Sequence, residues 1–224
     1  MITSAANPRL KLVRKLASAR QRDKLGLFVA EGEDLVDAAL AAGLEPVELL
    51  VAGETVAPEL IASVSTLPHP ARVIGVFRRD DLRPFEQRPA ALALWQVADP
   101  GNVGTLIRTA DAFGASVALS AGCADPSGPK ALRASAGAAF RVPLGPFEQP
   151  AGRWIALVAQ GGRPLPEVDL SGECVFVLGA ERGGLPDEVL GRCEVRATIP
   201  TPGPGESLNV AAAGAIALYD WCRS

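Results

Sequence analysis

Histidine is nearly absent from this sequence, and the only one, His69, stands between two prolines as in a loop. The commonest general base is therefore missing, which disfavours a Ser-His-Asp relay. The cysteines contain no C-x-x-C pair, so the sequence predicts neither a zinc site nor a disulfide framework. They are Cys123, Cys174, Cys193 and Cys222.

Long apolar runs are absent as well. The longest uncharged apolar stretch, residues 210–219, is too short to span a bilayer. Residues 1–20 are basic and polar, without the apolar segment of a secretion signal. We therefore expect a soluble cytoplasmic protein with no membrane partner. With 224 residues, 48% of them hydrophobic, the chain has ample material for one domain or two smaller ones.

The two signs of charge are separated along the chain, although the formal net charge is only −3. Residues 1–30 hold seven Lys or Arg against one Asp, whereas residues 31–60 hold eight Asp or Glu and neither Lys nor Arg. Asn7 and Pro8 are typical of the N-cap and first residue of a helix. Its apolar face holds Leu12, Val13 and Leu16, and its basic face holds Lys11, Arg14, Lys15 and Arg22. This face is either a solvated surface or an arm that contacts the phosphates of a nucleic acid.

The order of apolar runs predicts two α/β units joined by a linker over residues 78–89. The first unit is expected to have strands over 27–30, 47–52 and 72–77 and a helix over 33–42. The second is expected to have strands over 91–97, 116–120, 154–159, 174–178 and 195–199, and helices over 103–113, 129–138, 186–192 and 208–221. This alternation predicts a mostly parallel sheet with helices on both faces.

Three segments rich in glycine or proline follow predicted strands, where open α/β sheets bind their ligands. They are residues 99–114 (DPGNVGTLIRTADAFG), 178–185 (LGAERGGL) and 199–210 (IPTPGPGESLNV). None matches G-x-G-x-x-G, and the chain has no G-x-x-x-x-G-K-[ST]. The sequence thus lacks both the dinucleotide fingerprint and the phosphate loop.

The first segment is expected to bring backbone close to a ligand at Gly101 and Gly104. Asn102 is expected to cap the following helix, and Arg108 lies one and a half turns later. The alternative is a merely structural helix in which Arg108 pairs with Asp111.

In the second segment, Glu181 either interacts with the dipole of the next helix or holds an arginine or a donor-rich ligand. In the third, Ser207 is expected to cap the last helix, with Asn209 one turn inside. The exposed backbone groups of so irregular a loop suit an adenine edge. A serine nucleophile is disfavoured, because residues 205–209 are not G-x-S-x-G and no histidine stands ready to activate Ser207.

Together these segments resemble the motifs of the SpoU/TrmH family in the SPOUT superfamily, which are S-adenosylmethionine-dependent RNA ribose 2′-O-methyltransferases. Residues 130–141 are similar to the family's segment between its first and second motifs. Residues 7–11 and 28–32 resemble its N-terminal RNA-binding domain, which is similar to ribosomal protein L30e. The chain departs from the pattern at Ala211, where many relatives have serine, and in its compactness between residues 52 and 72.

The resemblance implies an α/β fold with two domains. Residues 1–85 would form a small L30e-like domain that binds substrate RNA. Residues 90–224 would form the methyltransferase domain, a mostly parallel sheet with a C-terminal trefoil knot. The resemblance further implies S-adenosyl-L-methionine as cofactor, RNA as partner, a homodimer and no metal. Ribosomal RNA is preferred over transfer RNA as the substrate, and a role in antibiotic self-resistance stays open.

The resemblance also assigns roles to residues. The catalytic set is Asn102, Arg108, Glu181, Ser207 and Asn209. The cofactor-binding set is Leu178, Gly179, Ile199, Pro200, Ser207, Leu208 and Asn209. The RNA-binding set is Arg9, Lys11, Arg14, Lys15, Arg133 and Ser135. Because a guanidinium stays protonated, we expect Arg108 to grip the target phosphate and polarise the hydroxyl, with the proton leaving to phosphate or water.

Two other functions remain as alternatives at this point. One is a non-catalytic RNA-binding protein that retains the fold, which the intact catalytic set disfavours. The other is a nucleotide-using α/β enzyme outside the family, which the missing phosphate loop disfavours.

Overall fold

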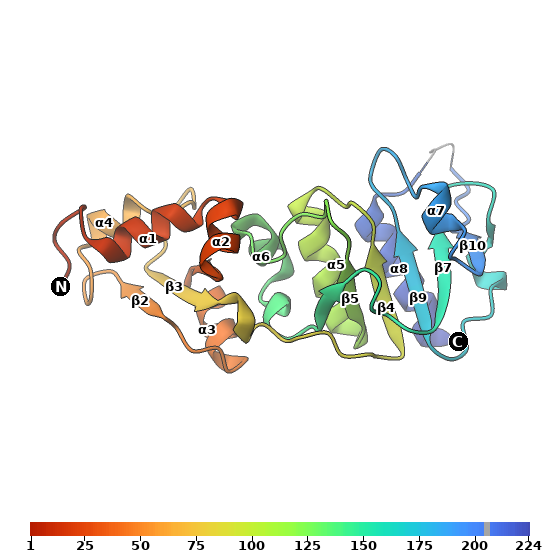
Figure 1. The fold of residues 1–224 in the computed structure, drawn as a ribbon, viewed down its shortest axis with the longest axis horizontal. Coiled ribbons are helices and arrows are strands. Elements are labelled where there is room, and N and C mark those ends of the chain that lie inside the picture. Colours follow the sequence, from red (N-terminus) through yellow and green to blue (C-terminus); the bar gives the residue numbers. More distant parts are fainter. Residues whose placement is uncertain (204–206) are drawn as a thin grey trace.

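A three-stranded antiparallel sheet lies at the centre of the N-terminal module, our name for residues 1–85 (Figure 1). The computed structural model describes residues 1–203 and 207–224 of the chain. The strands, in sheet order, are β1 (Leu27–Glu31), β3 (Val73–Arg78) and β2 (Glu48–Val51), and the helices are α1 (Pro8–Leu16), α2 (Ala19–Leu25), α3 (Glu33–Ala41) and α4 (Pro58–Ala62). The predicted strands and the predicted α3 are confirmed to within a residue or two at each end, and α4 was not predicted.

Helix α1 begins as the sequence predicts, because the side chain of Asn7 accepts a hydrogen bond from the backbone N–H of Arg9. Its buried residues Leu10, Val13 and Leu16 pack against the sheet. The predicted basic face was wrong at one position. The chain leaves the helix at Ala17 and starts α2, so that Arg22 turns inward and is only 5% exposed.

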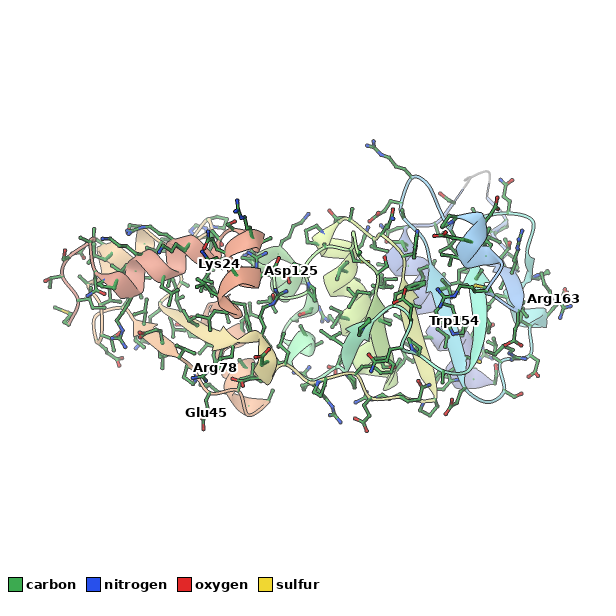
Figure 2. The ribbon with its side chains drawn as sticks, viewed as in Figure 1. Lys24, Glu45, Arg78, Asp125, Trp154 and Arg163 are labelled. Carbon is green, nitrogen blue, oxygen red and sulfur yellow. The ribbon has the colours of Figure 1, made fainter. Side chains whose placement is uncertain are left out.

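Arg22 is buried because it joins the two modules. Its guanidinium contacts Asp125, in the loop before α6 (Pro129–Ser135), at 2.8 Å and donates to the carbonyls of Leu16 and Ala17. Arg79 contacts the other carboxylate oxygen of Asp125 at 2.7 Å. Figure 2 places Asp125 at the junction between the N-terminal module and the rest of the chain.

Apolar contacts reinforce this junction. The rings of Phe28 in β1 and Phe140 stack with centroids 5.9 Å apart. Gly137 has a φ of +81°, and a Cβ there would lie only 2.6 Å from the Cβ of Ala38 in α3. The predicted linker thus connects two modules that share one continuous apolar core.

We expect Arg22→Met to lower the free energy of unfolding by about 3 kcal/mol, because it removes one partner of a largely buried ion pair. Burial alone would raise the pKa of Asp125, but hydrogen bonds from Ser127 and Arg22 and the charge of Arg79 hold it below its ordinary value. The pair therefore stabilises the fold above about pH 4, and its contribution is lost as pH falls through the folded pKa of Asp125.

Urea unfolding at pH 7 and pH 3 measures this effect. The matched control is Arg72→Met, which breaks an exposed pair with Glu54 in the same module and should cost at most about 1 kcal/mol. Equal losses for the two variants at pH 7 would contradict a stabilising role for the junction.

Seven strands form the second sheet, in the C-terminal module (residues 90–224), and every neighbouring pair is parallel. In sheet order they are β6 (Leu144–Pro146), β5 (Ser116–Leu119), β4 (Ala90–Leu94), β9 (Cys174–Leu178), β7 (Arg153–Leu157), β10 (Val195–Thr198) and β8 (Arg163–Pro164). With α6, the helices are α5 (Pro100–Phe113), α7 (Asp187–Leu190) and α8 (Val210–Arg223). The predicted mixed α/β fold with a mostly parallel sheet is confirmed.

Alternate residues of the central strands pack on opposite faces, as the two-residue period of a strand requires. Leu92 and Phe176 belong to the cluster that includes residues of α5 and α8, whereas Ala93 and Val175 pack with Val189 of α7. Because both faces are covered, these strands are apolar throughout.

Helices α5 and α8 lie side by side on one face of the sheet. A Cβ at Gly214 of α8 would lie 2.4 Å from the end of the Leu106 side chain of α5, so a larger residue there would push this side chain aside. Across residues 1–203 and 207–224, no helix combines the length and apolarity needed to cross a membrane.

Candidate active site

A cavity of about 1180 Å³ lies at the carboxyl ends of β9, β7 and β10, bounded by the start of α8. The second and third glycine-bearing segments line it, although residues 204–206 of the third segment lie outside the described residues. Every residue predicted to bind the cofactor is in this lining: Leu178, Gly179, Ile199, Pro200, Ser207, Leu208 and Asn209. The structure therefore brings the predicted set together, while its role stays a proposal.

The second segment folds back on itself beside the cavity. Ala180 and Gly184 exchange backbone hydrogen bonds in a tight turn, and Gly184 has a φ of +62°. A Cβ at Gly179 would lie 2.3 Å from the carbonyl carbon of Gly184. Glycine is thus required at one position for close approach and at the other for conformation.

The first segment reaches the site through a polar cluster of three side chains. The Nδ2 of Asn102 donates to Oε1 of Glu181 at 3.0 Å, and the Nδ2 of Asn209 donates to Oδ1 of Asn102 at 3.1 Å. The backbone N–H groups of Ala98 and Asp99 also point to the Glu181 carboxylate, at 3.4 and 3.3 Å. One residue from each segment therefore meets at a single point, which we call the amide–carboxylate cluster.

Glu181 is an anion at neutral pH. Partial burial on its own would raise its pKa, but the hydrogen bonds from Asn102 and from the backbone N–H groups outweigh burial and hold the pKa below its ordinary value. A carboxylate with a lowered pKa is a poor proton acceptor. Its contacts instead fix the Asn102 amide, whereas the predicted contact of Glu181 with an arginine or a donor-rich ligand stays a prediction.

The predicted helix caps were wrong by a few residues. Helix α5 begins at Pro100 and is capped by Asp99, whose carboxylate accepts from the backbone N–H of Asn102. Helix α8 is capped by Asn209, whose Oδ1 accepts from Ala211 and Ala212, and not by Ser207. At the start of α5 the candidate caps are Asp99 and Asn102, and at the start of α8 they are Ser207 and Asn209. Because Asp99 and Asn209 form the caps, the side chains of Asn102 and Ser207 are left at the site.

The sequence predicted that Gly104 brings the backbone close to a ligand, and this prediction was wrong. A Cβ there would lie 2.3 Å from the carbonyl oxygen of Ala131, so Gly104 allows α5 to pack against α6. Gly101 lies beside Asp99, the N-cap of α5, because a Cβ at Gly101 would be 2.7 Å from Oδ1 of Asp99. Lys130 of α6 also contacts Asp99, at 2.9 Å, which ties the start of α6 to the start of α5.

Arg108 is exposed on α5 and lies outside the cavity lining. It does not pair with Asp111, because Asp111 contacts Arg141 instead. Within the part of the chain that the structure describes, we find no hydrogen bond or ion pair of the Arg108 guanidinium. The Arg108–Asp111 pair that the structural alternative required is therefore not formed, and the donors of Arg108 are available to a ligand.

The predicted RNA-binding residues differ in how free they are. Lys11, Lys15 and Arg133 are exposed. Arg9 pairs with Glu48, and Arg14 donates to the Ala5 carbonyl and to Ser63. Ser135 is fully buried and its hydroxyl donates to the Leu132 carbonyl, so the prediction that it contacts RNA does not fit its position.

Sequence reasoning missed the last residue of β7 and the loop after it, which also line the cavity: Leu157, Val158, Ala159, Gln160 and Gly161. The signal was present, because a predicted strand over 154–159 precedes two consecutive glycines. A second hollow, of about 530 Å³, belongs to residues 1–9 and 54–55 at the far end of the N-terminal module. In the described ranges, no three His, Cys, Asp or Glu side chains gather as a metal site would need.

A parallel α/β sheet with a loop-lined cavity at its carboxyl edge defines a protein that binds a nucleotide-sized molecule. Comparison with known proteins gives the family. Residues 89–219 match the SpoU rRNA Methylase family and residues 7–79 match the MRM3-like substrate binding domain. The chain belongs to the SpoU rRNA methylase family, as the motifs predicted.

Relatives and solved structures agree with this assignment. The chain is 31% identical to the 23S rRNA (guanosine(2553)-2'-O)-methyltransferase RlmP of Bacillus subtilis, over 97% of both proteins. It is also similar to the crystal structure of an AdoMet-bound rRNA methyltransferase from Sinorhizobium meliloti, with a TM-score of 0.88, 31% identity and coverage of 99% of this chain and 97% of that one. The SpoU methyltransferase AviRb of Streptomyces viridochromogenes shares the fold, with a TM-score of 0.83 over 97% of each chain at 23% identity.

Proposed function

We propose that this protein transfers a methyl group from S-adenosyl-L-methionine to a ribose 2′-hydroxyl of RNA. The observation that carries the proposal is the meeting of all three segments at one point: two line the cavity and the first joins them through the amide–carboxylate cluster. Membership of the SpoU rRNA methylase family supports the same activity.

The cavity suits this cofactor in size and in chemistry. Its volume of about 1180 Å³ is somewhat larger than the ~300–1,000 Å³ typical of small-molecule pockets, so a bent nucleoside fits with room for part of a substrate. Its lining combines apolar residues such as Leu178 and Ile199 with the glycine-bearing turns, a combination that suits an adenine and its ribose. When bound, S-adenosylmethionine supplies a methyl group that is already activated by the positive sulfur.

The side chains of this chain then have to place the hydroxyl and help its proton leave. Asn102 is held by Glu181 and Asn209, which leaves its orientation fixed before substrate arrives. Arg108 keeps its charge and its five donors, so it grips the target phosphate and polarises the hydroxyl. The proton leaves to phosphate or water, since the pKa of Glu181 is too low for a base.

Isothermal titration calorimetry with S-adenosylmethionine tests the first step and separates this proposal from the non-catalytic alternative. Binding together with methylation of RNA supports an enzyme. RNA binding without any uptake of S-adenosylmethionine would instead favour an RNA-binding protein that retains the fold.

The N-terminal module is proposed to bind the RNA, mainly through the exposed Lys11 and Lys15 and the adjacent Arg9 and Arg14. Their match to a substrate-binding domain and the local excess of positive charge support this role. Arg133 of α6 lies near the same module, 3.5 Å from the Thr66 hydroxyl, and extends the basic surface toward the site.

Replacing Arg9, Lys11, Arg14 and Lys15 by glutamine should weaken RNA binding and reduce the slope of log K against log salt by about 3. The single-turnover rate at saturating RNA should change by less than about twofold, because phosphate contacts mainly set affinity. Filter binding at several salt concentrations and rapid-quench methylation give the two numbers. A large fall of the saturated rate would place α1 in the active site.

Several finer features complete the proposal. The C-terminal part of the chain is proposed to form a trefoil knot, and two copies are proposed to pack around the site, in the cytoplasm. Ile216 and Tyr219, exposed on the outer side of α8, support a second copy as the occupant of that face. Ribosomal RNA is the preferred substrate, and mapping 2′-O-methyl groups in total RNA from cells with and without this gene identifies the nucleotide.

A further inference from the structure

Two residues other than glycine have a positive φ within residues 1–203 and 207–224: Gln96, at 51°, and Ala136, at 48°. This left-handed conformation is costly for a residue with a Cβ, and it persists where the surroundings impose it. Gln96 lies two residues after the end of β4, an inner strand, at the carboxyl edge of the sheet. Ala136 instead ends helix α6.

Contacts on both sides hold the backbone of Gln96 in place. Its N–H donates to the hydroxyl of Ser120, after β5, at 2.9 Å, and the neighbouring N–H of Trp95 donates to the Leu178 carbonyl at 2.8 Å. The Cγ of Gln96 lies against Gly122, where a Cβ would be 3.2 Å away. The loops after β4 and β5 thus fix the direction of this side chain.

The amide at the end of the side chain is not used by the fold. Gln96 is exposed, and among the described residues its amide has no hydrogen-bond partner. Glycine would adopt this conformation without strain, so the fold alone gives no reason for a glutamine. A side-chain amide offers a donor and an acceptor together, which is the pattern that reads the edge of a base.

The position of Gln96 relative to the cavity indicates which ligand its side-chain amide could contact. The cavity occupies the ends of β9, β7 and β10, whereas the ends of β4 and β5 lie on the side of the N-terminal module (Figure 1). Glu181 marks the border, because it binds the backbone of Ala98, two residues after Gln96. Gln96 therefore lies at the same edge of the sheet as the cavity, on the side of the N-terminal module that is proposed to bind RNA.

We propose that Gln96 is a specificity-determining residue, whose amide hydrogen-bonds to the edge of the target base or of the base next to it. This inference rests on the proposed RNA methylation and goes beyond it by naming the residue that selects the nucleotide. RNA sequence is read from unstacked bases through such edge contacts, which a phosphate-binding surface cannot supply.

Gln96→Gly tests the proposal, with Ala136→Gly as the matched control. Both variants relieve a positive φ, so both should fold with an unchanged or higher Tm and bind S-adenosylmethionine as the wild type does. Only Gln96→Gly should lower kcat/KM on an RNA fragment around the mapped nucleotide, by roughly tenfold or more. Gln96→Glu, which keeps the size and loses the donor, should show a similar loss.

The decisive readout is discrimination among fragments that carry each of the four bases at the target and at its two neighbours. Wild type and Ala136→Gly should prefer one base by tenfold or more at one of these positions, and Gln96→Gly should lose that preference. A slower Gln96→Gly that keeps the full preference, or one as fast as wild type, would overturn the proposal. If the proposed function itself is wrong, the wild type will methylate no fragment. The base preference can then still be measured as a difference in RNA binding between the wild type and Gln96→Gly.

Discussion

Arg108→Lys is expected to lower the single-turnover rate at saturating RNA and S-adenosylmethionine by about a hundredfold or more. A lysine keeps the charge but presents a single ammonium, which cannot hold a phosphate and a hydroxyl with a planar pair of donors. Because Arg108 lies outside the cavity lining, the affinity for S-adenosylmethionine should not change. Rapid-quench methylation and calorimetry measure the two effects separately.

Arg83→Lys is the matched control, since Arg83 is an exposed arginine that pairs only with the nearby Glu86 in the linker among the described residues. Its rate should equal that of the wild type. If Arg108→Lys also kept the wild-type rate, a bidentate role of the guanidinium would be untenable, and the charge alone would carry the effect.

Glu181→Ala is expected to reduce the same rate by about a hundredfold, with little change in stability. The variant leaves the Asn102 amide and the N–H groups of Ala98 and Asp99 without their common acceptor. Asn102 then loses its fixed orientation, although the exposed carboxylate contributes little to folding. Glu181→Gln, which keeps one acceptor oxygen for Asn102, should lose less.

The control is Glu188→Ala. Glu188 is an exposed glutamate in α7, seven residues after Glu181, so this variant removes a surface carboxylate without removing the acceptor of Asn102. The pH profile provides a second check on Glu181. Its pKa is lowered by the hydrogen bonds from Asn102 and the backbone, so Glu181 is ionised at neutral pH and the wild-type rate should show no inflection from this group there. A Glu181→Ala variant with the wild-type rate would show that the amide–carboxylate cluster does not orient the substrate.

The fold could be predicted where the signal was local. The apolar runs that form β9 and β5, and the Asn7–Pro8 pair that starts α1, are each signals of only a few consecutive residues, so the sequence pattern alone predicts them. The short edge strands β6 and β8 were missed, because they have three and two residues and are defined only by their neighbours in the sheet.

The site was predictable as a set of segments but not in its geometry. The glycines that surround the cavity stood out in sequence, whereas the competition between Asp99 and Asn102 for one helix cap is decided by tertiary contacts. Arg22 and Ser135 show the same limit. Their side chains looked available to RNA, yet one is buried against Asp125, 103 residues away, and the other against its own helix.

A crystal structure of the protein with S-adenosylmethionine tests the central claim most directly. The account predicts a bent ligand between residues 178–184 and 199–209, with its methyl group facing the cluster of Asn102, Glu181 and Asn209. An empty cavity at millimolar excess of the ligand, or a ligand bound elsewhere on the protein, would contradict it.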